Sequence, residues 1–501
     1  MRSDKVWDYI VVGGGSAGCI VAARLAEMTE ANILLLEAGR SDEADPLALQ
    51  MSRLDDQDSS YDWGYVAAPV QGKAGRIKYA RAMMLGGCAN HNDCAFLPPP
   101  MSDLDRWASM GASGWDAASM QPALAAIEGR LNVESAPQGT SLSRAFIDAG
   151  LVLGLPFREY RSTIGPGAGW FPLNATGDLR QSSSVGYLHP LDDAPSNLDV
   201  RTNVKVSRVL MEHGRAVGVE TPGGSLACCG EVILCAGSIN TPHLLMLSGI
   251  GPAQHLKSHG IAVHADVPGV GHNLVDHVAA NIVYELHKAP PQWQRTPCEA
   301  VITMQVDDMA GAPDLLFHFI PQLREKYLGE VRFGGARHGF KISPNVTRPK
   351  SRGWIELASA DPDDKPLINL NYLSDPEGYD LKTLVHGLRQ ARRLGQSSAL
   401  SHWAKRELAP GPDVMSDDDL ADYARDNCET VYHPAGTCRM GDESEADTVV
   451  SSDLKVKGVT GLRVVDASVF PDMITVNINN TVMMIGEHGA QLIAKDWQAQ
   501  A

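Results

Sequence analysis

The first forty residues contain the feature that most restricts how this chain folds. An apolar run over residues 6–12 ends in Gly13-Gly-Gly-Ser-Ala-Gly18, and a second apolar run, Ile33–Leu36, ends at Glu37. Between the two runs, apolar side chains recur with helical spacing over about residues 17–28. Strand, glycine turn, helix, strand and acidic residue therefore follow one another in the order that a dinucleotide-binding βαβ unit requires.

The glycine turn and the acidic residue each have a physical role in binding a nucleotide. Gly13 permits the tight turn, Gly15 lets the backbone approach a pyrophosphate, and Gly18 allows the helix to pack on the strand. The helix begins with free N–H groups and a positive dipole end, which attract phosphate. Glu37 can accept both ribose hydroxyls, which argues against NADP but does not separate FAD from NAD. The predicted nucleotide site also includes Ser16 and Ala38.

Length, charge and cysteine content exclude several other classes of protein. A chain of 501 residues is expected to form two domains. A net charge of −17 without a basic stripe argues against a nucleic-acid partner. Nine irregularly spaced cysteines without C-x-x-C argue against a disulfide framework or a metal site and favour a cytoplasmic setting. The sequence lacks a run of 18 apolar residues and a signal peptide, so we expect no membrane partner.

The remaining segments differ in character. Residues 41–130 look irregular and are rich in Asp, Gly, Pro and Met. Alternating patterns at Leu315–Ile320 and Trp354–Leu357 predict an antiparallel sheet with helices on one side. A strand at Leu462–Asp466 and a final helix over about 481–497 close the chain.

We therefore expect a fold that combines the α/β and α+β classes. The first domain is a Rossmann-like nucleotide-binding domain built from discontinuous segments, residues 1–155, 190–280 and 425–501. The second is a substrate-binding domain, residues 156–189 and 281–424, with an antiparallel sheet flanked by helices.

Further motifs along the chain carry a family resemblance. In order they are Arg81–Asp93 (RAMMLGGCANHND), Gly237–Pro252 (GSINTPHLLMLSGIGP), Tyr432–Gly441 (YHPAGTCRMG), Asp466–Pro471 (DASVFP) and Thr475–Glu487 (TVNINNTVMMIGE). Together they resemble the glucose–methanol–choline (GMC) oxidoreductases over nearly the whole chain, and the choline-oxidising members most closely. The resemblance implies FAD as the cofactor, an alcohol as the substrate and hydride transfer to flavin N5.

The resemblance also implies which further residues contact FAD. The Gly86 and Gly87 loop, with Asn92, would lie against the flavin, and Val204 would offer its backbone to the adenine. Asp466 and Ala467 would lie by the phosphates or the ribitol. His91 matches the histidine that carries covalently attached flavin in choline-oxidising members, and the alternative is an unlinked histidine beside the ring.

Alcohol oxidation requires removal of a hydroxyl proton and a carbon-bound hydride. Histidine suits the base, and a neutral amide suits the developing alkoxide. His433 and Asn477 match the His–Asn pair of the family, although Asn479 competes with Asn477 if the segment is extended. Val431 matches an apolar position that choline-oxidising members use near the flavin for oxygen, and the alternative is a plain core valine.

The substrate-binding residues show both matches and departures. Glu299 matches the substrate-binding glutamate of choline-oxidising members through a weak local similarity, with an exposed strand carboxylate as the alternative. Tyr432 matches the tyrosine beside the catalytic histidine. Arg53 falls where those members place a cage tryptophan, and Asp93 replaces a serine. Both changes favour a related amino alcohol or another primary alcohol over choline itself.

Several functions remain open at this stage. The leading hypothesis is an FAD-dependent alcohol oxidase that reduces O2 to H2O2. The alternatives are a dehydrogenase that uses a quinone or another acceptor, a lyase on the same scaffold, and a catalytically silent flavin-binding protein. A homodimer is the candidate assembly.

Overall fold

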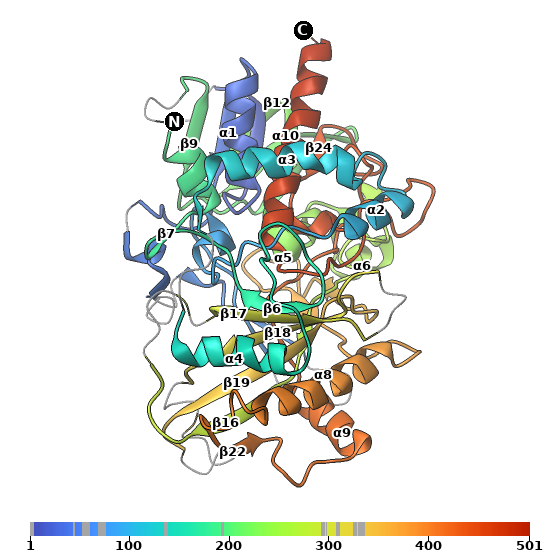
Figure 1. Ribbon diagram of the computed structural model, residues 1–501. Helices are drawn as coiled ribbons and strands as arrows, with labels where there is room; N and C mark the ends of the chain where they lie inside the picture. The colour runs from blue at the N-terminus through green and yellow to red at the C-terminus, as the bar shows by residue number, and fades with distance from the viewer. Residues whose placement is uncertain are drawn as a thin grey trace.

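The computed structural model describes residues 5–43, 46–52, 61–68, 77–134, 139–191, 195–291, 296, 298–306, 311–323, 328 and 336–500. Two halves built on different sheets lie one above the other (Figure 1). The upper half contains a mainly parallel sheet with helices α1 and α10, and the lower half contains a large antiparallel sheet with helices α4 and α8.

The parallel sheet is formed by strands from the beginning, the middle and the end of the chain. Its order is β24-β12-β1-β2-β9, and every pair along this path is parallel. The strands are β1 (Trp7–Val12), β2 (Ile33–Leu36), β9 (Leu198–Arg201), β12 (Gly224–Leu234) and β24 (Leu462–Val464). The first part of β12 continues as an antiparallel meander with β11 (Arg215–Thr221) and β10 (Arg208–Glu212). The predicted discontinuous, Rossmann-like architecture is confirmed.

Helix α1 (Gly18–Met28) starts at the predicted glycine turn. Gly13 has a φ of +100°, and a Cβ there would lie 2.6 Å from the carbonyl oxygen of Cys235. A Cβ on Gly18 would lie 1.9 Å from the carbonyl oxygen of Gly13. Only glycine therefore lets α1 pack this closely on the end of β1. Helix α10 (Asn479–Gln500) packs on α1, and α3 (Ala117–Arg130) packs on α10.

The antiparallel sheet has the order β22-β16-β19-β18-β17-β6, and β15 joins it by pairing with β19 and β23. Its strands are β6 (Gly167–Trp170), β15 (Val278–Ala279), β16 (Ile282–Leu286), β17 (Ala300–Met304), β18 (Leu315–Ile320), β19 (Gly339–Val346), β22 (Ala404–Ala409) and β23 (Glu429–Thr430). All its ladders are antiparallel, as the alternation at Leu315–Ile320 predicts.

Helices α4 (Ser141–Val152) and α8 (Tyr379–Gly395) cover one face of this sheet, and α9 (Asp417–Asn427) packs on α8. Phe146 of α4 stacks on Phe319 of β18 with ring centroids 4.5 Å apart. Because side chains alternate along a strand, the neighbouring His318 points to the opposite face. That opposite face borders the cavity described below.

The remaining elements are short. They are α2 (Met101–Ser109), α5 (Gly237–Leu247), α6 (Ala253–Ser258), β3 (Tyr65–Ala67), β4 (Ile77–Tyr79), β5 (Val133–Glu134), β7 (Leu173–Thr176), β8 (Leu179–Arg180), β13 (Ile250–Gly251), β14 (Ala265–Asp266), β20 (Trp354–Glu356), β21 (Leu367–Asn369), and the single-turn elements η1 (Pro46–Leu49), η4 (Gly87–Asn90), η5 (Ser184–Leu188) and η8 (Ala467–Val469).

Two sequence predictions differ from the structure. The segment 41–130 was predicted to be irregular, yet it contains α2 and α3, and Asp116 caps α3 by accepting a 3.0 Å bond from Ser119 N. The Trp354–Leu357 pattern forms β20, which pairs with β21 outside the antiparallel sheet. The domain boundaries stay a prediction, although α4, predicted within residues 1–155, packs on the antiparallel sheet.

Candidate active site

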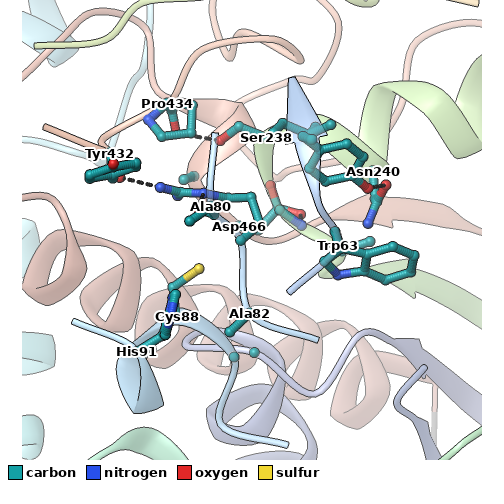
Figure 2. A pocket seen from close by; sticks show the side chains of 18 of the residues that line it. Trp63, Ala80, Ala82, Cys88, His91, Ser238, Asn240, Tyr432, Pro434 and Asp466 are labelled. Atoms are coloured by element: carbon teal, nitrogen blue, oxygen red, sulfur yellow. Dashed lines mark hydrogen bonds between the residues drawn. The ribbon is translucent and has the colours of Figure 1, made fainter. Parts of the chain in front are cut away.

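A cavity of about 670 Å³ runs from the parallel sheet to the antiparallel sheet. Its size lies within the range of small-molecule and cofactor sites. Most of the residues that the sequence selects line it: Gly13, Gly15, Ser16, Glu37, Ala38, Gly87, His91, Asn92, Asp93, Val204, Val431, Tyr432, His433, Asp466, Ala467 and Asn477. Figure 2 shows part of this lining, with His91 and Cys88 on one side and Tyr432 and Pro434 on another.

The nucleotide end of the cavity fits a dinucleotide. The carboxylate of Glu37 accepts hydrogen bonds from the backbone N–H of Gly14 (2.9 Å) and Gly39 (2.7 Å), which hold it at the end of β2. Burial raises the pKa of Glu37. A Cβ on Gly15 would come no closer than 4.0 Å to the Gly87 Cα, so this backbone stays open to the cavity. These features match the room and the acceptor that a bound FAD would need.

Gly18 and Gly86 do not line the cavity, and both act by shaping it. Gly86 has a φ of +84° and precedes η4, which carries the chain toward His91. Asn90 fixes this turn, because its Nδ2 donates to Leu85 O (2.8 Å) and to Asp42 Oδ2 (3.0 Å). Burial lowers the pKa of His91 to about 4, so its imidazole is neutral near pH 7.

Asp466 organises the centre of the cavity. Its Oδ2 accepts bonds from Gly237 N (2.9 Å) and Thr241 Oγ1 (2.6 Å), and its Oδ1 accepts from Ser468 N (2.8 Å). The side chain therefore joins the start of α5 to the start of η8. Its contact with FAD phosphate or ribitol stays a prediction.

His433 forms a hydrogen-bonded pair with His277, which the sequence analysis missed. The two Nδ1 atoms lie 2.8 Å apart. Nε2 of His277 lies 2.9 Å from two carbonyl oxygens, those of Thr347 and Ile474, which can only accept. Nε2 of His277 must therefore carry hydrogen. Burial lowers the pKa of His277, so the ring is neutral and its Nδ1 accepts.

This arrangement determines the tautomer of His433. Since Nδ1 of His277 accepts, Nδ1–H of His433 must donate, and Nε2 of His433 carries the lone pair that can take up a proton. Asn477 Nδ2 lies 3.4 Å from that Nε2. Burial, with His277 and His318 nearby, lowers the pKa of His433 well below its ordinary value. His433 is therefore a neutral base with Nε2 as the proton acceptor.

The backbone of His433 is held equally firmly. Its N–H donates to Asp276 Oδ1 at 2.8 Å. The other oxygen of Asp276 accepts from Tyr79 Oη (2.7 Å), Tyr372 Oη (2.5 Å) and Thr430 Oγ1 (2.6 Å). Four donors thus fix one carboxylate, and this carboxylate fixes the loop before the imidazole.

Asn477 rather than Asn479 faces the base. Asn479 Oδ1 accepts from Ser16 Oγ at 2.8 Å, which directs that side chain to the glycine turn. Asn477 Oδ1 is buried without a hydrogen-bond partner, and Asn477 lines the cavity. A buried polar atom without a partner points to a ligand. A substrate hydroxyl could donate to His433 Nε2 and accept from Asn477 Nδ2.

The antiparallel sheet adds polar groups that the sequence analysis also missed. Asn345 Nδ2 can only donate, and it gives one hydrogen to Leu316 O (2.7 Å) and the other to Nδ1 of His318 (3.1 Å). Burial lowers the pKa of His318 to about 3, so Nε2–H of a neutral ring is a donor at the cavity wall. Lys341 Nζ lies 2.6 Å from Glu429 Oε1, and both line the cavity. The signal available in the sequence was His318, a polar residue within the otherwise apolar strand Leu315–Ile320.

Glu299 lies away from the cavity, so the structure does not support its predicted role in substrate binding. Its Oε2 accepts from Thr140 N (2.9 Å), Thr140 Oγ1 (3.0 Å) and Ser143 Oγ (2.6 Å) at the start of α4. The preceding residue, Cys298, lines the cavity instead. Cys298 and Glu299 directly precede β17, and at this point the two adjacent side chains face different surroundings. The predicted residue Arg53 lies outside the described residues.

Within the described part of the chain, no helix combines the length and the apolar character needed to cross a membrane. The same residues include no cluster of three or more His, Cys, Asp or Glu side chains suited to a metal ion.

Comparison with known proteins gives consistent matches. The GMC oxidoreductase profiles match residues 7–279 (amino-terminal part) and 349–486 (carboxyl-terminal part). A choline oxidase from Arthrobacter globiformis is 39% identical, with 98% of this chain and 95% of the relative covered. An alcohol dehydrogenase [acceptor] from Pseudomonas putida is 33% identical over 98% and 96%. Pyridoxine 4-oxidase from Mesorbium loti has a TM-score of 0.89 at 29% identity, covering 97% and 98%.

Proposed function

The chain belongs to the GMC oxidoreductase family and is an FAD-dependent enzyme acting on CH–OH groups, and we propose that it oxidises a primary alcohol to the aldehyde with O2 as the electron acceptor. The observation that carries this proposal is a neutral imidazole whose Nε2 can accept a proton, paired with the amide of Asn477, whose Nδ2 lies 3.4 Å from that Nε2 and whose Oδ1 has no hydrogen-bond partner.

The chain's own residues would handle the hydroxyl proton. His433 Nε2 accepts the proton, and its Nδ1–H bond to His277 stabilises the imidazolium that forms. Asn477 Nδ2 donates to the oxygen as negative charge develops there. His318 lines the same cavity and offers a second donor. When bound, FAD supplies the acceptor for the hydride that leaves the carbinol carbon.

We infer O2 as the acceptor because Val431, an apolar residue, lines the cavity two positions before His433. The balanced reaction converts the alcohol and O2 to the aldehyde and H2O2. A second candidate is a dehydrogenase with another acceptor, which the name of the Pseudomonas putida relative favours. We further propose that His91, which lines the cavity and is kept neutral by burial, would hold FAD covalently, the new C–N bond replacing a flavin C–H bond and the two electrons released passing to O2.

Anaerobic mixing with a panel of primary alcohols, choline included, tests the proposal. Bleaching of the flavin followed by stoichiometric peroxide on admission of air supports an oxidase. Bleaching that is reversed by quinone or dye but only slowly by air supports the dehydrogenase. Absence of bleaching by every alcohol refutes alcohol oxidation. Acid precipitation tests the His91 link, because colour released wholly into the supernatant excludes it.

A further inference from the structure

The cavity contains one carboxylate whose hydrogen bonding is incomplete. The carboxylates that line it are Glu37, Asp93, Asp363, Asp364, Glu429 and Asp466. Among these, Asp93 alone has a single long hydrogen bond, from Thr296 Oγ1 at 3.4 Å, and no ion pair with a described residue. The others accept bonds of 3.0 Å or less from backbone N–H groups, hydroxyls or lysines.

The surroundings of Asp93 do not neutralise its charge. The nearest cation that affects it is Arg180, whose guanidinium is buried and donates to three backbone carbonyls, those of Asn92, Gln50 and Ala48. Burial raises the pKa of Asp93, because the surrounding protein disfavours the charged carboxylate. A partly buried carboxylate that accepts one long hydrogen bond is poorly stabilised, and a bound cation would supply the missing partner.

The position of Asp93 relates it to the substrate. It follows His91 by two residues and lines the same cavity as His433 and Asn477. Its nearest neighbours include Thr296 and Cys298, which come just before β17 on the wall that also carries His318. Because both side chains line one cavity, we expect that a molecule whose hydroxyl binds His433 extends a second group toward Asp93.

The chemistry of that second group follows from the lining. The aromatic rings among the described lining residues are Trp63, Tyr65 and Tyr432. Trp63 and Tyr65 stack on each other, and Tyr65 Oη donates to Asn240 Oδ1 of α5, at the nucleotide side. Tyr432 is 48% exposed. With two of these three rings packed on each other and the third exposed, the described lining favours recognition of a cation by hydrogen bonding to Asp93 over enclosure by aromatic rings of the kind that hold quaternary ammonium groups.

We propose that Asp93 binds a protonated amine of the substrate, so that the enzyme selects alcohols with an N–H-bearing ammonium over quaternary or neutral ones. This inference rests on the proposed alcohol oxidation. An ammonium N–H donates a charge-assisted hydrogen bond to the carboxylate, whereas a quaternary nitrogen has no hydrogen to donate. A hydrogen bond between charged groups corresponds to about a 10- to 100-fold preference.

The test compares two alcohols of the same shape. Dimethylethanolamine carries a protonated nitrogen where isoamyl alcohol carries a carbon, and choline adds one methyl group. We expect the wild-type enzyme to be reduced by dimethylethanolamine with a kred/Kd about 10- to 100-fold above that for isoamyl alcohol, and above that for choline. In Asp93→Asn and Asp93→Ser this ratio should approach one. Asp413→Asn is the matched control, since this exposed carboxylate lies outside the cavity, and it should keep the wild-type ratio.

The outcomes separate the two proposals. Bleaching by isoamyl alcohol without preference for the amine, or an unchanged ratio in both Asp93 variants, overturns the role of Asp93 and leaves alcohol oxidation intact. If no alcohol bleaches the flavin, the proposed function fails. Even then, dimethylethanolamine binding can be followed by its effect on the flavin spectrum. Binding about 10-fold weaker in Asp93→Asn supports the site, and equal binding overturns it.

Discussion

Removal of His277 should slow catalysis although this residue touches no substrate. His277 does not line the cavity, and within the described part of the chain the His433 imidazole has two hydrogen-bond contacts, its Nδ1–H to Nδ1 of His277 and its Nε2 to Asn477 Nδ2. In His277→Ala, the buried Nδ1–H of His433 would lose its acceptor, which costs about 1–3 kcal/mol. The His433 tautomer with its hydrogen on Nδ1 would then no longer be favoured over the tautomer with its hydrogen on Nε2, which cannot act as the base through Nε2.

Each 1.36 kcal/mol added to the activation free energy lowers a rate tenfold, so this loss predicts a rate of flavin reduction about 10- to 100-fold lower. The assay is anaerobic stopped-flow reduction with a primary alcohol at saturating concentrations. The substrate Kd should change little, because His277 lies behind His433 and not in the cavity. His277→Gln keeps an acceptor and a donor on one side chain and should recover part of the rate.

A purely structural role would give a different result. In that case His277→Ala would lower thermal stability and flavin content, while the flavin-loaded fraction would still be reduced at the wild-type rate. Reduction at the wild-type rate by the loaded variant, or a change confined to Kd, would refute the assignment of the tautomer.

Three other predictions follow from the same structure. The pKa of His433 is lowered, and its neutral form is the base. The rate of flavin reduction should therefore stay constant as pH falls from 8 to 6.5 and decline only well below 6.5. A decline that begins above pH 7 would contradict this. Gly18→Ala should abolish FAD binding, because the new Cβ would lie 1.9 Å from Gly13 O; a yellow, folded variant would show that the turn can move. Glu299→Ala should lower the free energy of unfolding by about 1–3 kcal/mol, because three hydrogen bonds at the start of α4 are lost. Denaturant unfolding measures this loss, and kred should be preserved.

The sequence predicts those parts of the site that depend on local backbone geometry. The turn between β1 and α1 needs glycine at positions 13 and 18 for reasons of space, and these reasons are visible in the residue order alone. The predicted pairing of His433 and Asn477 came from motif resemblance, and the 3.4 Å distance agrees with it. Their catalytic roles remain proposals.

Other parts of the site depend on register and on long-range packing, which a sequence does not specify. Glu299 and Cys298 are neighbours, and one residue of register decides which of them faces the cavity. The contact between His277 and His433 arises where β15 and β23 pair, so nothing near either residue announces it. Asp93 stands out in the sequence as a departure from its family, but its single long hydrogen bond appears only once its neighbours are placed.

The rate constant of anaerobic flavin bleaching in wild type and in His433→Ala tests the central claim most directly, with His402→Ala, an exposed histidine, as the control. We predict prompt bleaching by a primary alcohol in the wild type and in the control, and a rate about 100- to 10,000-fold lower in flavin-loaded His433→Ala, the range that general-base catalysis supplies. Equal bleaching rates in all three proteins would contradict the role of His433 as the base.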